Sequence, residues 1–138
     1  MARKGPRTAP CGVADARARI RKAEEFLAQA RRALTDPASP DAAAALAVLA
    51  GIAASDAVCC AQLGIRSRGQ DHRQAREILG KVHPNGMQMA RLLDELLSAK
   101  DATHYGTILV EHGRALRLVQ QAERLVLSAR KTMVKDKN

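Results

Sequence analysis

The chain has 138 residues, the size of one ordinary domain, and its 46% hydrophobic and 27% charged residues are not the composition of a disordered chain. Aromatic residues make up 1%, with Phe26 and Tyr105 the two present, which argues against single-strand nucleic-acid modules that stack bases on aromatic side chains. The formal net charge is +9, and the excess lies in residues 1–35 and 130–138, because residues 36–129 hold as many acids as bases. These basic ends predict either contact with phosphates or an acidic partner, or simple solubilising segments.

Hydrophobic spacing, followed in chain order, predicts a helical protein. Residues 1–12 contain two Pro, two Gly and several bases, which predicts a mobile basic arm. Apolar residues then recur at steps of three and four, and proline or glycine separates one run from the next. We therefore predict an all-α fold, an up-and-down four-helix bundle with one additional short helix, as a single domain over 13–131 with a basic tail at 132–138. Gly64 is expected to end the second helix in the left-handed conformation. The expected helices are 13–34, 41–63, 71–80, 87–105 and 111–131.

The most apolar segment, residues 42–63, is long enough to span a bilayer. Its single charged residue is Asp56, and alanine is its commonest residue. Alanine contributes little insertion energy and a central Asp costs about 2.5–3.5 kcal/mol on insertion scales, so burial by neighbouring helices explains the pattern better. We expect a central bundle helix here and no membrane partner.

Three cysteines, Cys11, Cys59 and Cys60, are an odd number without the spacing of a paired-cysteine metal site. Residues 1–12 lack the apolar stretch of a signal peptide. We expect a reduced, cytoplasmic protein that uses its cysteines as small apolar residues and holds no metal.

Two charged residues interrupt the apolar stripes of the predicted helices. Asp56 continues the stripe of Leu49 and Ile52, and Lys100 continues that of Leu93 and Leu96. Because an unpaired buried charge is expensive, we expect Asp56 and Lys100 to form a buried polar pair across the bundle. Such a pair either fixes the register of the helices or contributes to a ligand site.

His104 lies one helical turn after Lys100 and is followed by Tyr105, which makes this the densest titratable cluster of the chain. Histidine suits acid–base catalysis at neutral pH, so His104 is a candidate catalytic residue, and Lys100 and Tyr105 are candidate ligand-binding residues. The alternative is a histidine held by hydrogen bonds in the structure.

A second cluster occupies the basic loop after the second helix. Arg66, Arg68 and Arg73 could grip a phosphate with bidentate hydrogen bonds, and Asp71 and His72 lie among them. The alternative is that Asp71 caps the short helix and the arginines face water. Glycine-rich phosphate loops and the common hydrolase motifs are missing from the sequence, and no cofactor is indicated.

Several short motifs resemble the HEPN superfamily. They are the run Leu96-Leu97-Ser98-Ala99-Lys100-Asp101-Ala102-Thr103-His104-Tyr105-Gly106, the later Ala122-Glu123-Arg124-Leu125-Val126, the segment Gly51-Ile52-Ala53-Ala54-Ser55-Asp56-Ala57, and Gly69-Gln70-Asp71-His72. The resemblance implies a four-helix bundle, frequently a homodimer, associated with nucleotide or RNA chemistry in toxin–antitoxin or defence systems.

Catalytically active members of that superfamily are metal-independent ribonucleases with an arginine, four to six residues, and then a histidine. Residues 97–99, at this spacing before His104, include no arginine, while Arg66 precedes His72 by five intervening residues but outside the family's motif position. We therefore expect a non-catalytic binding module for nucleotide, RNA or a partner protein. The alternatives are a ribonuclease toxin that uses His104 or His72, and a protein that binds nucleic acid through its basic terminal arms.

Overall fold

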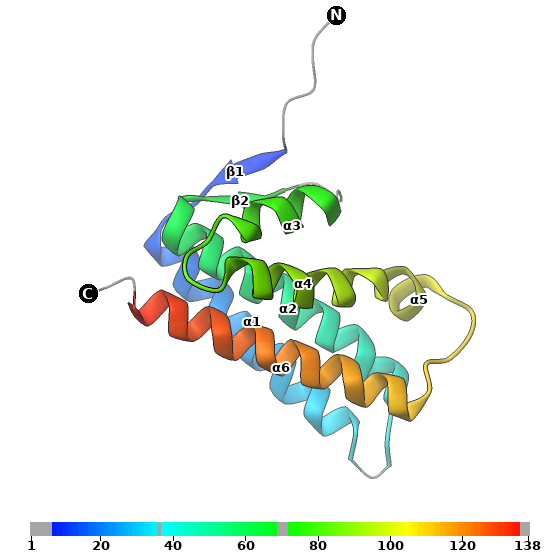
Figure 1. Cartoon of the computed structure of the whole chain (residues 1–138). Coiled ribbons are helices and arrows are strands. Elements are labelled where there is room, and N and C mark those ends of the chain that lie inside the picture. The colour runs from blue at the N-terminus through cyan, green and yellow to red at the C-terminus, as the bar shows by residue number, and fades with distance from the viewer. Residues whose placement is uncertain (1–6, 36, 69–71, 136–138) are drawn as a thin grey trace, which may run out of the picture.

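The computed structural model describes residues 7–35, 37–68 and 72–135 (Figure 1). The described chain is mostly helical, with one small sheet, so the predicted all-α class is confirmed. The elements in chain order are β1 (Thr8–Pro10), α1 (Val13–Ala33), α2 (Pro40–Leu63), β2 (Ile65–Ser67), α3 (His72–Gly80), α4 (Gly86–Ser98), α5 (Lys100–Tyr105) and α6 (His112–Lys135).

Local sequence signals account for the ends of the helices. Pro40 opens α2 at a position where its missing N–H costs nothing, and Gly64 ends it with φ of 71°, the left-handed conformation that the sequence predicted. One difference concerns the predicted helix over 87–105, which is interrupted at Ala99 and continues as the short helix α5.

Helix α2 is the centre of the fold and packs against α1, α4 and α6. The long helices run side by side, and those consecutive in the chain point in opposite directions (Figure 1). Alanines cover much of α2, and most of them are fully buried, which lets the neighbouring backbones come close. At Gly51 an added Cβ would lie 2.4 Å from Cδ1 of Leu96, so α2 and α4 cross where a side chain on α2 does not fit.

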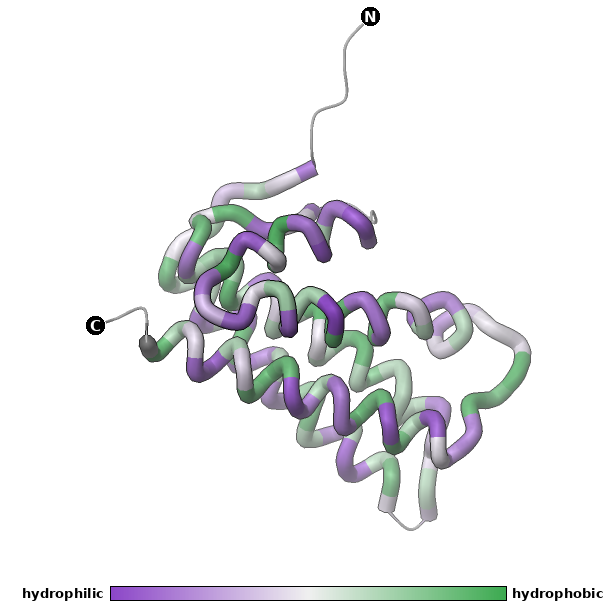
Figure 2. Tube along the Cα trace, viewed as in Figure 1, coloured by the Kyte–Doolittle hydropathy of each residue, from purple (hydrophilic) through white to green (hydrophobic). Residues whose placement is uncertain are grey.

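The apolar character of α2 is explained by this central position. Pro40–Leu63 has the length and mean hydropathy of a membrane-spanning helix, but 78% of its most apolar window is buried in the bundle. Polar and apolar residues alternate around the outer helices, whereas α2 is almost continuously apolar (Figure 2). The core helix of a globular protein has the same properties.

A small antiparallel sheet joins the start of the chain to the segment after α2. Thr8 pairs with Ser67 and Pro10 with Ile65, the backbone N–H of Cys11 donates to the carbonyl of Gly64 over 2.9 Å, and a disulfide joins Cys11 to Cys60. The expectation of reduced cysteines is therefore wrong for this pair, while Cys59 is free and buried. The described part of the expected basic arm, residues 7–12, is tied along β2, and residues 1–6 lie outside the described structure.

Candidate anion-binding pocket

A polar pocket of about 250 Å³ opens where α1, α2, β2, α3 and the junction of α4 with α5 meet. Its apolar wall is formed by Ile52, Ala75, Leu93 and Leu97. The remaining lining residues are polar or charged: Arg19, Ser55, Asp56, Arg66, Ser67, Arg68, His72 and Lys100. Segments that are far apart in sequence thus contribute side chains to one small space.

Asp56, one of the lining residues, is paired with Arg19. The Nη2 of Arg19 donates to Oδ2 of Asp56 over 2.9 Å, and the side chains are 29% and 11% exposed. Burial raises the pKa of the Asp56 carboxyl above its usual value, and the positive charges of Arg19 and Arg66 oppose this shift without cancelling it. The cationic neighbours therefore stabilise the ionised carboxylate, but they do not fully offset the cost of removing it from water.

The partner of Asp56 differs from the predicted one. Lys100 lines the same pocket, but among the described residues no ion pair within 4.0 Å joins it to Asp56. The physical reason is the position of Arg19 on α1, which brings its guanidinium into contact with the carboxylate. The planar donors of a guanidinium match the two oxygens of a carboxylate. Asp56 and Lys100 line the same pocket, and Arg19 is a third charged member.

Positive charge exceeds negative charge in the pocket. Four cationic side chains, those of Arg19, Arg66, Arg68 and Lys100, face the single carboxylate of Asp56, which leaves a formal charge of +3 with His72 neutral. Of these cations, only Arg19 has an ion pair within the described parts of the chain. Such an excess in a confined space favours an anionic ligand.

Two buried polar atoms of the pocket residues have no hydrogen-bond partner in the described structure. They are Nε of Arg19 and Oγ of Ser67. A buried donor without a partner is costly, and a bound ligand or water commonly supplies the missing acceptor. Both residues thus add hydrogen-bonding capacity to the cationic lining.

The structure brings together only part of the predicted site. Arg66, Arg68, His72 and Lys100 share the pocket, whereas Asp71 lies outside the described residues. Arg73 is exposed on α3 and does not line the pocket. The two clusters that the sequence analysis treated separately therefore meet at Lys100.

His104 and Tyr105 lie elsewhere, on α5. The Nε2 of His104 is 3.3 Å from the carbonyl oxygen of Ala45, which holds the ring against α2, and Tyr105 is 74% exposed. Their rings meet edge to face at a centroid distance of 6.0 Å. Neither residue lines the polar pocket, so the expected cluster of Lys100, His104 and Tyr105 is divided.

Sequence reasoning missed Arg19 and Ser67. Arg19 lies at steps of three and four from Ala16 and Ala23, so it occupies the buried stripe of α1, and this position was the available signal. Ser67 carries no such signal, because its place depends on the β1–β2 pairing.

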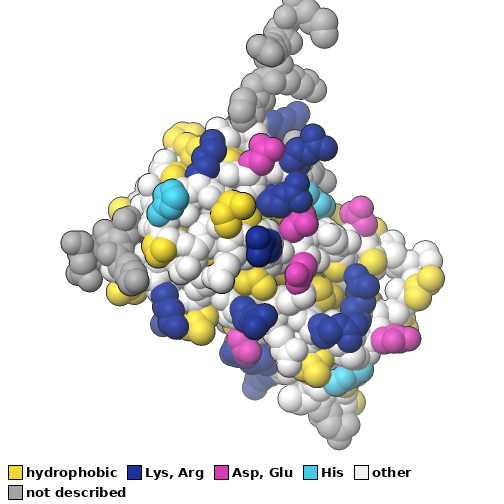
Figure 3. Space-filling view, in the orientation of Figure 1, with side chains coloured by type: hydrophobic (Ala, Val, Ile, Leu, Met, Phe, Trp, Pro, Cys, Tyr) yellow, Lys and Arg dark blue, Asp and Glu magenta, His cyan; other side chains and the backbone are white. Residues whose placement is uncertain are grey.

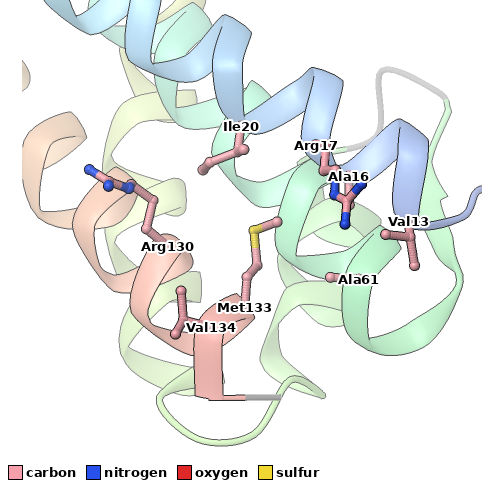
Figure 4. Close-up of a pocket in the computed structure, with 8 residues that line it drawn as sticks. All are labelled: Val13, Ala16, Arg17, Ile20, Ala61, Arg130, Met133 and Val134. Atoms are coloured by element: carbon pink, nitrogen blue, oxygen red, sulfur yellow. The ribbon is translucent and has the colours of Figure 1, made fainter. Parts of the chain in front are cut away.

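A second hollow is chemically different. A groove of about 370 Å³ at the end of the bundle lies between the start of α1 and the end of α6 (Figure 4). Its floor is apolar, with Ile20 and Met133 directed into it, and Arg130 at its edge is paired with Glu24 at 3.1 Å. It contains none of the predicted site residues, so we take the polar pocket as the candidate site.

A scan against models of protein families finds no match for this chain, and a search of curated proteins finds none either. Within the described residues there is no group of three or more His, Cys, Asp or Glu side chains placed to hold a metal ion.

Proposed function

We propose that the protein is a non-catalytic, HEPN-like helical module that binds a phosphate-bearing ligand, a nucleotide or RNA, in the polar pocket, and that it does so in the cytoplasm. The observation that carries this proposal is the convergence of Arg66, Arg68 and Lys100 on one pocket without an acid of their own among the described residues. Arginine forks match the oxygens of a phosphate, and a lysine adds a mobile point charge.

The mixed charge on one face of the molecule supports a local site. On the face shown in Figure 3, Lys and Arg side chains are interspersed with Asp and Glu, so no continuous basic surface covers it. A protein that binds nucleic acid mainly through the charges of the phosphate backbone needs an extended basic stripe on its surface. Residues 1–6 and 136–138, on which the alternative of basic terminal arms largely depends, lie outside the described structure.

Equilibrium binding of a 5′-nucleoside monophosphate and of a short RNA, measured by calorimetry, tests the proposal. Arg66→Gln and Lys100→Gln are each expected to weaken binding about tenfold or more, because a hydrogen bond to a charged group is worth about 1.5–3 kcal/mol. The matched control is Arg117→Gln, which removes an exposed charge on α6, away from the pocket. Equal losses in all three variants would show that only net charge matters, and unchanged binding in the pocket variants would contradict the proposal.

A ribonuclease is the second candidate, favoured by one specific observation. His72 and three arginines line the same pocket, which places a group able to transfer protons beside groups able to stabilise a phosphorane. RNA cleavage in the presence of a chelator, lost in His72→Ala while RNA binding persists, would replace the non-catalytic assignment. Cleavage that persists in both His72→Ala and His104→Ala would show that neither histidine catalyses it, which would contradict the ribonuclease candidate.

A further inference from the structure

The disulfide lies next to the wall of the polar pocket. Cys11 directly follows β1, and Cys60 lies in the last turn of α2, four residues before the glycine that leads into β2. Strand β2 consists of Ile65, Arg66 and Ser67, and Arg68 follows it, so three consecutive residues from Arg66 onward line the pocket. The disulfide therefore fixes β1, the strand that pairs with β2, and residues of β2 line the pocket.

Few other interactions hold β1 in this place. The two strands have three residues each, and the neighbouring backbone bonds are Cys11 N–H to Gly64 O at 2.9 Å and Arg68 N–H to Arg7 O at 2.8 Å. An isolated two-stranded pairing is marginally stable at best in water. The disulfide holds one end of β1 against α2, so its loss removes the strongest restraint on the pairing.

We propose that the Cys11–Cys60 disulfide is a redox switch for the polar pocket: the oxidised form fixes β2 and its arginines in the anion-binding arrangement, and reduction lowers the affinity for the phosphate-bearing ligand. The inference rests on the proposed function, since it concerns regulation of the same site. In compartments where thiols are kept reduced, disulfides are usually transient and either catalytic or redox-sensing, which agrees with a switch in a cytoplasmic protein.

The chemistry is a two-electron exchange with a dithiol. One thiolate of the dithiol attacks the sulfur of Cys11, because Cys11 is the more exposed residue of the pair, and the sulfur of the buried Cys60 leaves and takes up a proton. The second thiolate of the dithiol then attacks the mixed disulfide, releasing the Cys11 thiol and a cyclic oxidised dithiol. Two electrons and two protons pass from the dithiol to the protein.

Cys59 does not take part in this exchange, although it is adjacent to Cys60. Burial and the nearby negative charge of Asp56 raise the pKa of its thiol to about 12, with Ser55 opposing the shift through a hydrogen bond. At neutral pH the thiol is therefore protonated and is a poor nucleophile. This makes Cys59 the natural control position.

The experiment compares ligand affinity in the oxidised and dithiothreitol-reduced protein, with a 5′-nucleoside monophosphate as the probe. We expect reduction to weaken binding at least about fivefold, the lower range of ordinary coupling between sites. Cys59→Ala should respond to dithiothreitol as the wild type does. Cys11→Ser should bind weakly whether or not dithiothreitol is present.

Hydrogen exchange of the Cys11 and Arg68 amides gives a second readout that needs no ligand. We expect both amides to exchange faster after reduction, while the helical circular dichroism stays unchanged. Equal affinity in both redox states, unchanged exchange, or loss of the helices on reduction would each overturn the switch. Absence of binding in both states would overturn the proposed function instead, and the exchange rates would still decide whether the disulfide controls β2.

Discussion

Arg19 of α1 and Asp56 of α2, which both line the polar pocket, are joined by a hydrogen-bonded ion pair of 2.9 Å. The pair connects α1 to α2 through two residues that are 37 positions apart in sequence. It also places a carboxylate in a pocket with three further cations that form no ion pair among the described residues, so the same contact serves the packing of the bundle and the electrostatics of the pocket.

Removing Arg19 should therefore cost stability. Arg19→Met leaves the Asp56 carboxylate mostly buried without its hydrogen-bonded partner, and we expect the free energy of unfolding to fall by about 2 kcal/mol at neutral pH, below the full cost for a completely buried pair. Urea denaturation measures this change. The matched control is Arg31→Met, which breaks the ion pair with Glu123 on the exposed surface and should cost less than about 1 kcal/mol. If both variants lose the same free energy of unfolding, the burial of Asp56 does not make its ion pair more important for stability than an exposed one.

The raised pKa of Asp56 gives a pH dependence with a definite sign. Because the folded state binds this proton more tightly than the unfolded state, the contribution of Asp56 to stability falls as the pH rises from the unfolded value, near 3.8, through the raised folded value. Asp56→Asn removes this titration, so its stability relative to the wild type should increase across that window and stay constant above it. Denaturation at a series of pH values measures the difference. Asp94→Asn, which alters an exposed pair with Arg76, is the control, and the same pH trend there would contradict the assignment to Asp56.

The close crossing of α2 and α4 predicts a response to a single methyl group. Gly51→Ala adds a Cβ 2.4 Å from Cδ1 of Leu96, and the resulting overpacking should exceed the gain in helix propensity and destabilise the protein by about 1 kcal/mol. Gly113→Ala is the matched control, because the nearest atom to the added Cβ is a flexible arginine end at 3.8 Å. Thermal melts should show a lower midpoint for the first variant and an unchanged or higher one for the second. A higher midpoint for Gly51→Ala would mean that Leu96 moves aside without cost.

The disulfide should also contribute to global stability. It joins residues 49 apart, and a closed loop of that length removes about 4 kcal/mol of unfolded-chain entropy. Replacing Cys11 with Ser and Cys60 with Ala together should lower the free energy of unfolding by about this amount. The protein should remain folded, because the free energy of unfolding of a domain of this size is about 7–15 kcal/mol. Guanidinium denaturation with Cys59→Ala as the control measures it. If the control loses as much, the effect comes from core packing and not from the cross-link.

The sequence predicted most of the helical fold because its signals are local. The spacing of apolar residues sets each helix, and Pro40 and Gly64 mark the ends of α2 within a residue or two of their predicted places. Strand β1 and the Cys11–Cys60 bond were missed because both depend on partners about fifty or more residues away, and three residues are too few to show a period.

Several of the basic residues that line the candidate pocket were identified as candidates from the sequence. Arg66 and Lys100 were singled out, and both line one pocket of the structure. The partner of Asp56 was not predicted. Arg19 and Lys100 both continue apolar stripes, and the sequence does not show which of the two lies closer to Asp56.

Binding at the pocket and reduction of the disulfide should influence each other, since coupling between two sites is reciprocal. If the ligand favours the arrangement in which β2 is fixed, a saturating 5′-nucleoside monophosphate should slow reduction of Cys11–Cys60 by dithiothreitol, followed by the appearance of free thiols under native conditions. Lys100→Gln provides the control: Lys100 lines the pocket but belongs to α5 and not to β2, so its loss should weaken the ligand effect without changing the reduction rate of the free protein. An equal rate with and without ligand at saturation would show that the pocket and the disulfide act independently, whereas slowing that persists in Lys100→Gln at the same ligand concentration would place the ligand outside the pocket.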